Sequence, residues 1–285
     1  MNDFEESNSR PTKVALIQHC ATADVNQNME TLTKLIAQAA AQEAKFIALP
    51  EAFAFIGPDK EKRQILEPLS EVADQPTPIL DQCRALALQH QCELLLGGFH
   101  ERLSAEPPAA NTSVHILANG EIAALYRKIH MFDIDLADGT RLFESRATQA
   151  GNRAVTTQCA FGTLGLSICY DLRFPALYRR LVNLGAIAIS VPSAFTKTTG
   201  AAHWHALLRA RAIETQSYVL APAQHGRHSN KRQSYGHSLL IDPWGTVLAE
   251  GPAAEDAVLI GEIDPNKVAE VRTQMPVAKH HRPFD

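Results

Sequence analysis

The sequence has no long hydrophobic run and no strong excess of charge of either sign. No window approaches the roughly 18 apolar residues of a membrane-spanning helix. The polar, acidic N-terminus also lacks the apolar core of a secretory signal. The formal net charge is −4, which excludes a global basic field for nucleic acid. These absences predict a soluble, cytoplasmic protein that has neither a membrane nor a nucleic acid as its partner.

Paired cysteines and metal-binding motifs are also missing. The five cysteines form no CxxC pair and are odd in number; they are Cys20, Cys83, Cys92, Cys159 and Cys169. This pattern argues against a disulfide framework and against a zinc site, and it favours a reducing compartment. None of the twelve histidines lies in an HExxH motif, and neither a P-loop nor GxGxxG occurs. We therefore interpret the histidines as structural or surface residues, with a Cys–His dyad as an alternative.

What is present is an ordinary globular composition over 285 residues, 45% of them hydrophobic. That length allows about two domains or one large α/β domain. We find no linker of low complexity and no short repeat. The prediction is a flexible lead-in at residues 1–11 and one domain at 12–285.

Short apolar runs alternate with helical patterns along the chain. Strands are predicted at 14–17, 46–49, 94–96, 164–168, 187–191 and 219–220, and helices at 25–44, 79–89, after Pro175, and at 202–215. Asp24 is the expected N-cap of the first helix. Continuous apolar strands indicate a sheet covered on both faces, and the alternation indicates an α/β fold.

Two hairpin patterns interrupt this alternation. Strands at 114–117 and 122–125 flank the turn dipeptide Asn119-Gly120, and strands at 239–241 and 247–248 flank residues 242–245. Antiparallel pairs within an α/β pattern mean a mixed sheet or two sheets. We therefore predict a layered sandwich with helices outside. Residues 132–153 are expected to be irregular, as functional loops often are.

Cys169 is the candidate nucleophile. It follows the apolar run 166–168 and precedes 170–175, which leads into a helix. At such a strand-to-helix turn, backbone N–H groups can receive an oxyanion, and the helix N-terminus favours a thiolate. A buried core cysteine is the alternative.

Three charged residues are candidates to assist it. Glu51 follows a predicted strand and Pro50, at the kind of strand end where ligands of α/β sheets gather, and can act as a general base and then a general acid. Lys128 closes the second strand of the first hairpin, where an ammonium would stabilise an oxyanion. Glu144 can orient that lysine. Taken alone, Lys128 is more commonly a solvated charge at a strand end, and Glu51 has an exposed loop carboxylate or a helix cap as its alternative; Glu144 alone gives a very weak signal.

Together these residues form a recognisable pattern. Leu49-Pro50-Glu51, residues 127–130 and residues 169–175 occur in that order. From about Lys13 to its C-terminus the chain resembles the nitrilase superfamily of carbon–nitrogen hydrolases, whose signature is a Glu-Lys-Cys set in this order. The resemblance implies a four-layer α-β-β-α sandwich with mixed sheets, and a homodimer or higher homo-oligomer. It also implies that Glu51 is the base, Lys128 the oxyanion partner and Cys169 the nucleophile, with Glu144 matching a further family glutamate.

Within the superfamily, the chain is most similar to the deaminated glutathione amidase branch. The stretches that carry this similarity are 192–195, 199–204, 207–219, 223–228 and 235–251. The omega-amidase branch, which acts on 2-oxoglutaramate, shares much of the pattern, and an N-carbamoyl amine is a third possible substrate. The chain departs from the family at 136–139, where members often carry Ile-Pro-Gly, and at Ala176, where they often carry Glu.

The resemblance implies hydrolysis of a small-molecule amide through a thioester on Cys169. Lys128 and the backbone N–H of Tyr170 would hold the oxyanion, and no metal or organic cofactor is needed. Arg173 would hold a substrate carboxylate, with an ion pair to Asp171 as the alternative. Phe195 and Thr199 would line the acyl pocket, with loop packing as the alternative. A non-catalytic scaffold and a cysteine peptidase with a histidine base are the rival functions.

Overall fold

The computed structural model describes residues 11–69, 75–104, 108–135, 141–230 and 232–282. The predicted lead-in at 1–11 lies outside the described residues except for Pro11, and so does the family departure at 136–139. The assignment of 12–285 to a single domain stays a prediction.

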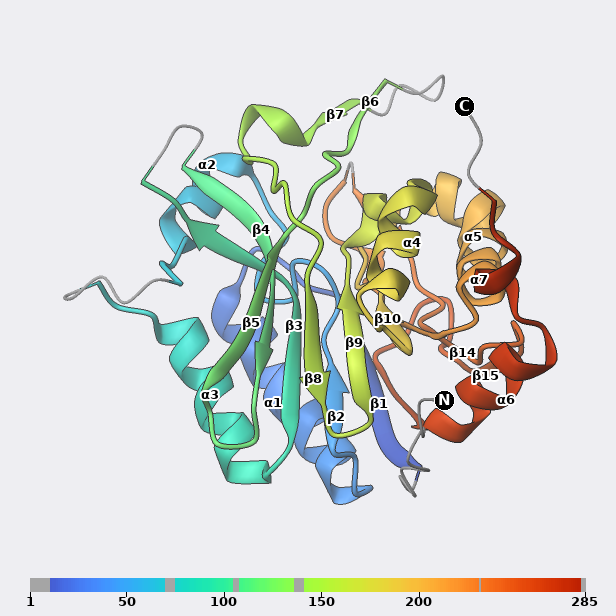
Figure 1. Cartoon of the computed structure of the whole chain (residues 1–285). Helices are drawn as coiled ribbons and strands as arrows, with labels where there is room; N and C mark the ends of the chain where they lie inside the picture. The colour runs from blue at the N-terminus through green and yellow to red at the C-terminus, as the bar shows by residue number, and fades with distance from the viewer. Residues whose placement is uncertain (1–10, 70–74, 105–107, 136–140, 231, 283–285) are drawn as a thin grey trace.

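Two six-stranded sheets form the middle of the molecule (Figure 1). The first has the order β16 (Ala257–Ile263), β1 (Thr12–Gln18), β2 (Phe46–Ala48), β3 (Glu93–Arg102), β4 (Ala109–Ile116), β5 (Ile122–Arg127). The second has the order β15 (Val247–Glu250), β14 (Leu239–Ile241), β11 (Tyr218–Ala221), β10 (Ala188–Ser190), β9 (Gly162–Leu166), β8 (Thr156–Cys159). Three central strands of each sheet are parallel and the outer pairs are antiparallel.

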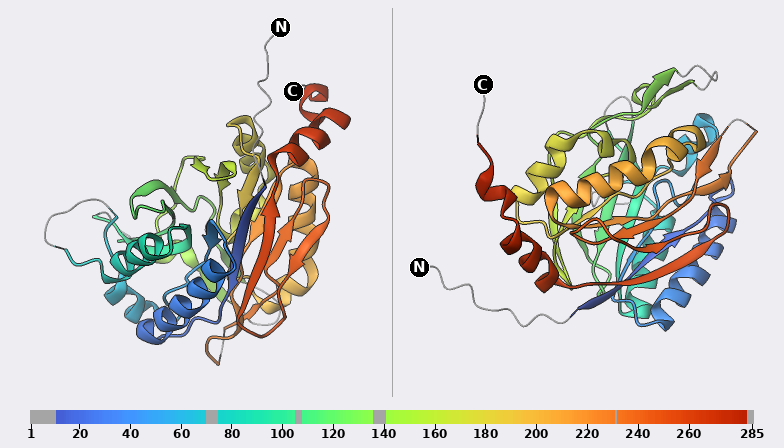
Figure 2. Two further views of the ribbon diagram at one scale, coloured as in Figure 1. Left: turned by 90° about the horizontal axis from the view of Figure 1, so that it is seen from below. Right: turned by 90° about the vertical axis from the view of Figure 1, so that its right-hand side faces the viewer.

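Helices cover the outer face of each sheet, as Figure 2 shows from two further directions. α1 (Val25–Ala41) and α3 (Pro78–His90) pack on the first sheet, and α4 (Pro175–Asn183) and α5 (Lys197–Thr215) on the second. The alternation of β1 explains this layering. Its Val14 and Leu16 belong to the core shared with the second sheet, whereas its Ala15 and Ile17 pack against α1. The predicted α-β-β-α sandwich is confirmed.

The predicted elements occur where the sequence places them, with small shifts at their ends. Asp24 caps α1, because its carboxylate accepts a hydrogen bond from the Gln27 N–H at 3.0 Å. α1 ends at Ala41 rather than 44, and α5 begins at Lys197 rather than 202. Both predicted hairpins form, as β4–β5 and β14–β15.

The structure corrects the expectation that 132–153 is irregular. Two short strands, β6 (Asp133–Asp135) and β7 (Arg141–Phe143), pair antiparallel there, and the 3₁₀ turn η2 (Glu144–Arg146) follows them. A strand of three residues is too short to show a recognisable alternation of apolar and polar residues, so the sequence pattern did not predict these two strands. Strand β16, an edge strand that pairs with β1 over seven residues, was not predicted from the sequence.

This topology brings several strand ends to one edge of the sandwich. The parallel strands β2 and β9 end there, and they lead directly to Pro50-Glu51 and to residues 167–169. Ligand sites of parallel sheets lie beyond such carboxyl ends. Among the described residues, no helix has both the length and the apolar character needed to cross a bilayer.

Candidate active site

The predicted triad comes together at this edge. Glu51 follows β2, Lys128 follows β5, and Cys169 opens the 3₁₀ turn η3 (Cys169–Arg173). All three side chains are buried and line the same cavity. The Lys128 Nζ lies 3.0 Å from Glu51 Oε1, and the Cys169 thiol is hydrogen-bonded to the Glu51 carboxylate. Residues 51, 128 and 169 therefore form one contiguous cluster.

Glu144 completes the cluster from η2. Its two carboxylate oxygens lie 2.8 and 3.1 Å from Lys128 Nζ. The amide of Asn111, on β4, donates to both carboxylates, at 2.9 Å to Glu51 and 3.2 Å to Glu144. Lys128 is thus bound by the two carboxylates, and the Asn111 amide links the same Glu51 and Glu144 carboxylates by a second pair of hydrogen bonds.

Backbone groups hold Glu51 from the other sides. The Ala194 N–H donates to Glu51 Oε2 at 2.8 Å. Strand β3 passes so close at Gly98 that an added Cβ would lie 2.9 Å from Glu51 Cγ and 2.8 Å from Asn111 Oδ1. Only glycine permits this approach. The position of the Glu51 carboxylate is therefore determined by three separate segments of the chain.

The electrostatics of the cluster assign its protonation states. Burial alone would raise the pKa of Glu51, but the Lys128 ammonium and hydrogen bonds from Cys169, Lys128 and the Ala194 amide outweigh burial and lower that pKa. Burial and then the Glu51 charge raise the pKa of the Cys169 thiol. Burial would lower the pKa of Lys128, but Glu144 and Glu51 raise it well above its usual value. At neutral pH the cluster holds a neutral thiol beside an ionised carboxylate, a pair suited to general-base activation.

Cys169 has a left-handed backbone conformation, with a φ of 48°. Such a conformation costs a non-glycine residue about 1–3 kcal/mol unless its surroundings impose it. The turn is held by the Cys169 N–H, which donates to Pro192 O at 3.0 Å, and by the buried Asp171. The Asp171 carboxylate accepts hydrogen bonds from the Ile168 N–H at 2.9 Å and the Tyr126 hydroxyl at 2.7 Å. Asp171 also accepts from the N–H of His130 at 3.0 Å, and it lies 2.7 Å from that ring's Nδ1.

Removing this support is expected to damage both stability and activity. Asp171→Ala leaves several buried donors without an acceptor, so we expect the free energy of unfolding to fall by about 3 kcal/mol or more. We expect kcat/KM to fall by at least about 10-fold, because the turn that carries Cys169 loosens. Urea unfolding and amidase kinetics below the new Tm measure the two effects. Tyr126→Phe, which removes one of these bonds, serves as the matched control and should cost about 1–2 kcal/mol. A folded Asp171→Ala with unchanged kcat/KM would contradict this role.

The four predicted substrate-binding residues lie at the margin of the site. Among the described residues that line the cavity around Cys169, none is Tyr170, Arg173, Phe195 or Thr199. The Arg173 guanidinium lies 5.8 and 5.4 Å from the ring centres of Tyr170 and Phe195, and donates to His203 Nδ1 at 3.3 Å.

The other two residues have structural neighbours of their own. Phe195 is buried against Trp204, with ring centres 5.0 Å apart. Thr199 Oγ1 lies 2.8 Å from the hydroxyl of Thr196, which does line the cavity. Substrate binding by Tyr170, Arg173, Phe195 and Thr199 stays a prediction.

Two cations that the sequence analysis did not single out line the cavity. Lys62 is on the short helix α2 (Asp59–Lys62), where its Nζ lies 3.0 Å from Asp59, and Arg232 precedes strand β13 (Gln233–Tyr235). His100 lines the same space, but burial lowers its pKa to about 4, so it is neutral at physiological pH. Asp59 also lines the cavity and pairs with Lys62, so Arg232 is the cation of the two that has more freedom to bind an anionic group of a substrate.

A Cys–His dyad finds little support in this geometry. Within the described part of the chain, the acidic or basic side chain bonded to the Cys169 thiol is Glu51. The nearby His130 is bound to Asp171, and its ring stacks on Phe174 with centres 3.6 Å apart.

Comparison with known proteins agrees with this geometry. A family model described as carbon-nitrogen hydrolase matches residues 13–273. The chain is 40% identical over 274 residues to a deaminated glutathione amidase of Synechocystis, covering 95% of this chain and 98% of that protein. It is 44% identical over 280 residues to the deaminated glutathione amidase of Bos taurus, covering 95% and 82% of the two chains.

Two solved structures have the same fold over nearly the whole of this chain. The C. elegans NitFhit protein superimposes with a TM-score of 0.87 at 38% identity, over 95% of this chain and 65% of that longer chain. Nit3 of Saccharomyces cerevisiae, described as a member of branch 10 of the nitrilase superfamily, superimposes with a TM-score of 0.85 at 29% identity. The superposition on Nit3 covers 96% of this chain and 97% of the Nit3 chain.

Proposed function

Because the chain belongs to the carbon–nitrogen hydrolase family, we propose that it hydrolyses deaminated glutathione to 2-oxoglutarate and cysteinylglycine, with Glu51, Lys128 and Cys169 as its catalytic residues. Two relatives at 40% and 44% identity carry the name of that amidase. The observation that carries the mechanism is the Cys169 thiol beside the Glu51 carboxylate, which accepts hydrogen bonds from Lys128 at 3.0 Å and from the Ala194 N–H at 2.8 Å.

In the first half-reaction the Cys169 sulfur attacks the amide carbonyl carbon. Glu51 takes the thiol proton as the C–S bond forms, and the carbonyl oxygen becomes an oxyanion that Lys128 and the Tyr170 N–H stabilise. The C–N bond then breaks, and Glu51 returns the proton to the leaving nitrogen. The products of this step are cysteinylglycine and a thioester between Cys169 and the 2-oxoglutaryl group.

In the second half-reaction water replaces the amine. Glu51 removes a proton from the water as its oxygen attacks the thioester carbonyl. The C–S bond breaks, and the same proton returns to the Cys169 sulfur. The enzyme regains its starting state and releases 2-oxoglutarate, so the cycle balances without an external oxidant or cofactor. Glu144 acts as a positioning residue, because its carboxylate binds Lys128 at 2.8 Å.

The substrate assignment is tested by a direct comparison of two amides that share one acyl group. Deaminated glutathione and 2-oxoglutaramate both place a keto acid on the acyl side, and only the former adds a glycine carboxylate on the leaving side. Because Lys62 and Arg232 both line the cavity, we expect kcat/KM for deaminated glutathione to be higher by about 10-fold or more. Parallel kinetics, with Cys169→Ala as the blank, measure the ratio. A preference for 2-oxoglutaramate would make the protein an omega-amidase, and turnover of neither would refute the substrate class.

The cavity cations give a second test of the same proposal. Arg232→Ala removes a charged carboxylate partner, so we expect kcat/KM for deaminated glutathione to fall by about 10- to 100-fold. If Arg232 binds the keto acid, turnover of 2-oxoglutaramate falls equally; if it binds the glycine carboxylate, only deaminated glutathione is affected. Arg173→Ala is the matched comparison, and we expect it to have the smaller effect because Arg173 lies outside the cavity lining. A loss confined to Arg173→Ala would instead support the sequence-based prediction.

We further propose that the protein works in the cytoplasm as a homo-oligomer. All five cysteines are free, which is typical of a reducing compartment. Ile213 on α5 and Trp244 beside β14 are large apolar side chains exposed to 43% and 56% in the single chain, and such exposure favours an interface between subunits. Light scattering of the purified protein measures the subunit number.

A further inference from the structure

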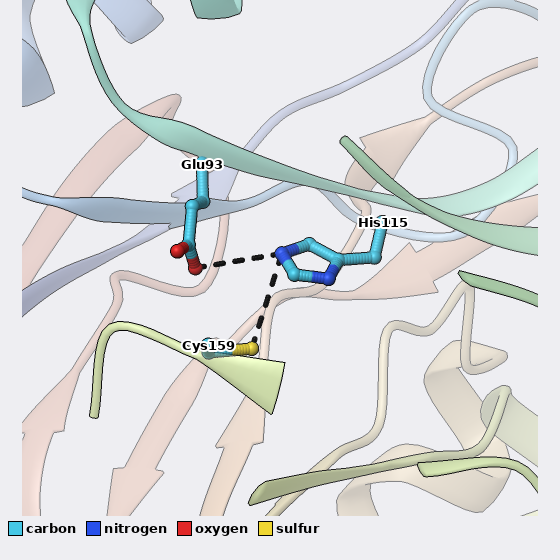
Figure 3. A group of neighbouring side chains, drawn as sticks. All are labelled: Glu93, His115 and Cys159. Carbon is cyan, nitrogen blue, oxygen red and sulfur yellow. Dashed lines mark hydrogen bonds and ion pairs between the residues drawn. The ribbon is translucent and has the colours of Figure 1, made fainter. Parts of the chain in front are cut away.

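Three potential metal ligands meet at the edge of the sandwich opposite the active site. Glu93 begins β3, His115 is near the end of β4, and Cys159 ends β8. Figure 3 shows the three side chains pointing toward one another, two from the first sheet and one from the second. The proposed reaction uses none of them.

The distances among the ligand atoms match those around a tetrahedral ion. With Zn–N, Zn–O and Zn–S bonds of roughly 2.0, 2.1 and 2.3 Å, tetrahedral geometry separates N from O by about 3.4 Å and N from S by about 3.5 Å. Here His115 Nε2 lies 3.4 Å from Glu93 Oε2 and 3.9 Å from Cys159 Sγ. No two of the three ligand atoms are more than 4.8 Å apart. The N–O distance is thus that of a tetrahedral site, and the sulfur would move closer to the imidazole by a few tenths of an ångström on binding.

The surroundings of His115 present its Nε2 as a ligand. The side chain is fully buried, and its Nδ1 lies 2.9 Å from Thr157 Oγ1, which can accept the Nδ1 proton. With the imidazole proton on Nδ1, the lone pair of Nε2 is directed at Glu93 and Cys159, the orientation that second-sphere partners impose in metal sites. Phe46 packs against the imidazole, with ring centres 5.9 Å apart, and shields this side of the cluster.

Charge and access also favour an ion. Binding of the ion would release the Cys159 proton to solvent, and the resulting thiolate and the Glu93 carboxylate would carry a charge of −2, which a divalent cation neutralises. Thiolate, imidazole and carboxylate are together the ligand types of Zn²⁺. The Glu93 side chain is 15% exposed, which gives the ion a route from solvent.

We propose that Glu93, His115 and Cys159 bind one Zn²⁺ that ties the two sheets together at the end of the sandwich far from Cys169. The site is structural, because its ligands hold strands from both sheets and it lies away from the proposed reaction. It departs from our expectation of no zinc site, which rested on sequence spacing. Ligands at 93, 115 and 159 belong to no short motif, and only the pairing of β3 with β4 and the stacking of the sheets bring them together.

The full-length protein with Zn²⁺ alone as the probe tests this proposal. After loading and dialysis against metal-free buffer, we expect about one zinc per chain by elemental analysis. We expect zinc to raise Tm over the chelator-treated protein by about 5 °C. Cobalt in place of zinc should give a thiolate-to-metal charge-transfer band. No retained zinc, or cobalt without a thiolate band, would overturn the proposal whatever the variants do.

Variants locate the ion. Cys159→Ser should remove the cobalt–thiolate band and weaken zinc binding by about 100-fold or more, and Thr157→Val, nearly isosteric, should weaken it by about 10-fold. Cys20→Ser is the matched control, because Cys20 Sγ also lies 3.9 Å from an imidazole nitrogen, that of His228. A Cys169→Ala background removes the active-site thiol from the assay.

A second group of ligands provides the opposing outcome. His205, His237 and Glu250 also lie within 4.8 Å of one another, but they are more exposed and include no thiolate. Zinc that survives Cys159→Ser and is lost in His205→Asn would belong to that group and would overturn the proposal. Retention in His205→Asn together with loss in Cys159→Ser supports it.

Discussion

Cys169→Ala should reduce kcat for deaminated glutathione to the level of the uncatalysed blank, a loss of up to about 10⁶-fold. The loss is the largest we expect, because the thiol is the only group in the proposed mechanism that forms a covalent bond to the substrate. The Cys169 side chain is buried beside Glu51, and the other four cysteines lie outside the cavity lining, so none of them can replace its sulfur. The variant should remain folded, since alanine removes one sulfur atom from the cavity wall.

Two measurements separate this result from simple damage to the site. Rapid quenching of the wild-type reaction, followed by mass spectrometry, should find the 2-oxoglutaryl group on a peptide that contains Cys169. Cys20→Ser, which changes a half-buried cysteine outside the cavity lining, should keep nearly full activity. Turnover in Cys169→Ala above about 1% of wild type would exclude the thioester mechanism.

The fold could be predicted well because its strongest signals are local. Apolar runs such as 14–17 and 46–49 are buried on both faces and become β1 and β2. Asn119-Gly120 fixes the β4–β5 turn, with Gly120 at a φ of 83°. β16 escaped prediction because it is a half-buried edge strand, whose register depends on pairing with β1 from the other end of the chain.

The residues of the triad could be named in advance because their order along the chain resembles the Glu-Lys-Cys signature of the nitrilase superfamily, whereas the strand end that each follows is weak evidence alone. Their partners could not. In the sequence Asn111 is not distinguished from other polar residues of β4. Only the folded structure shows that its amide donates to both Glu51 and Glu144. Asp171 was considered only as a partner of Arg173, yet its carboxylate binds Tyr126, His130 and Ile168 instead. Most of these contacts join residues that are more than 30 positions apart, and such contacts leave no periodic trace in a sequence.

The cations of the cavity show the same limit. Arg173 is four residues from the nucleophile in the chain, whereas Lys62 and Arg232 are distant in sequence and line the cavity. Proximity to Cys169 in the sequence favoured Arg173 as the carboxylate-binding residue. The structure favours Lys62 and Arg232 for this role, because α2 and Arg232 lie at the cavity. The competing Arg173→Ala and Arg232→Ala variants are therefore a test of the fold as well as of substrate binding.

Glu51→Gln should lower kcat/KM by about 10²- to 10⁴-fold, the usual contribution of a general base. Glutamine keeps the size of the side chain and can still accept the Ala194 N–H, but it cannot take the thiol proton. Lys128 remains paired with Glu144 at 2.8 Å, so the cluster should not collapse. Glu144→Gln is the matched control: it also removes a charge beside Lys128, but in the proposed mechanism it accepts no proton, and its loss should be smaller. A histidine-based peptidase would instead keep nearly normal acylation in Glu51→Gln.

The pH profile gives this prediction an independent readout. Burial would raise the pKa of Glu51, but Lys128 and the hydrogen bonds lower it below its ordinary value of 4.5. Glu51 therefore stays ionised as the pH falls from 7 to about 5, and kcat/KM should decline only below that ordinary value. The lowered pKa of Glu51 also stabilises the folded protein at any pH above the pKa that Glu51 has in the unfolded chain. This contribution is lost as the pH falls through the lower pKa that Glu51 has in the folded protein. In Glu51→Gln the residual activity should lose this acidic limb, and an unchanged limb would assign the base to another residue.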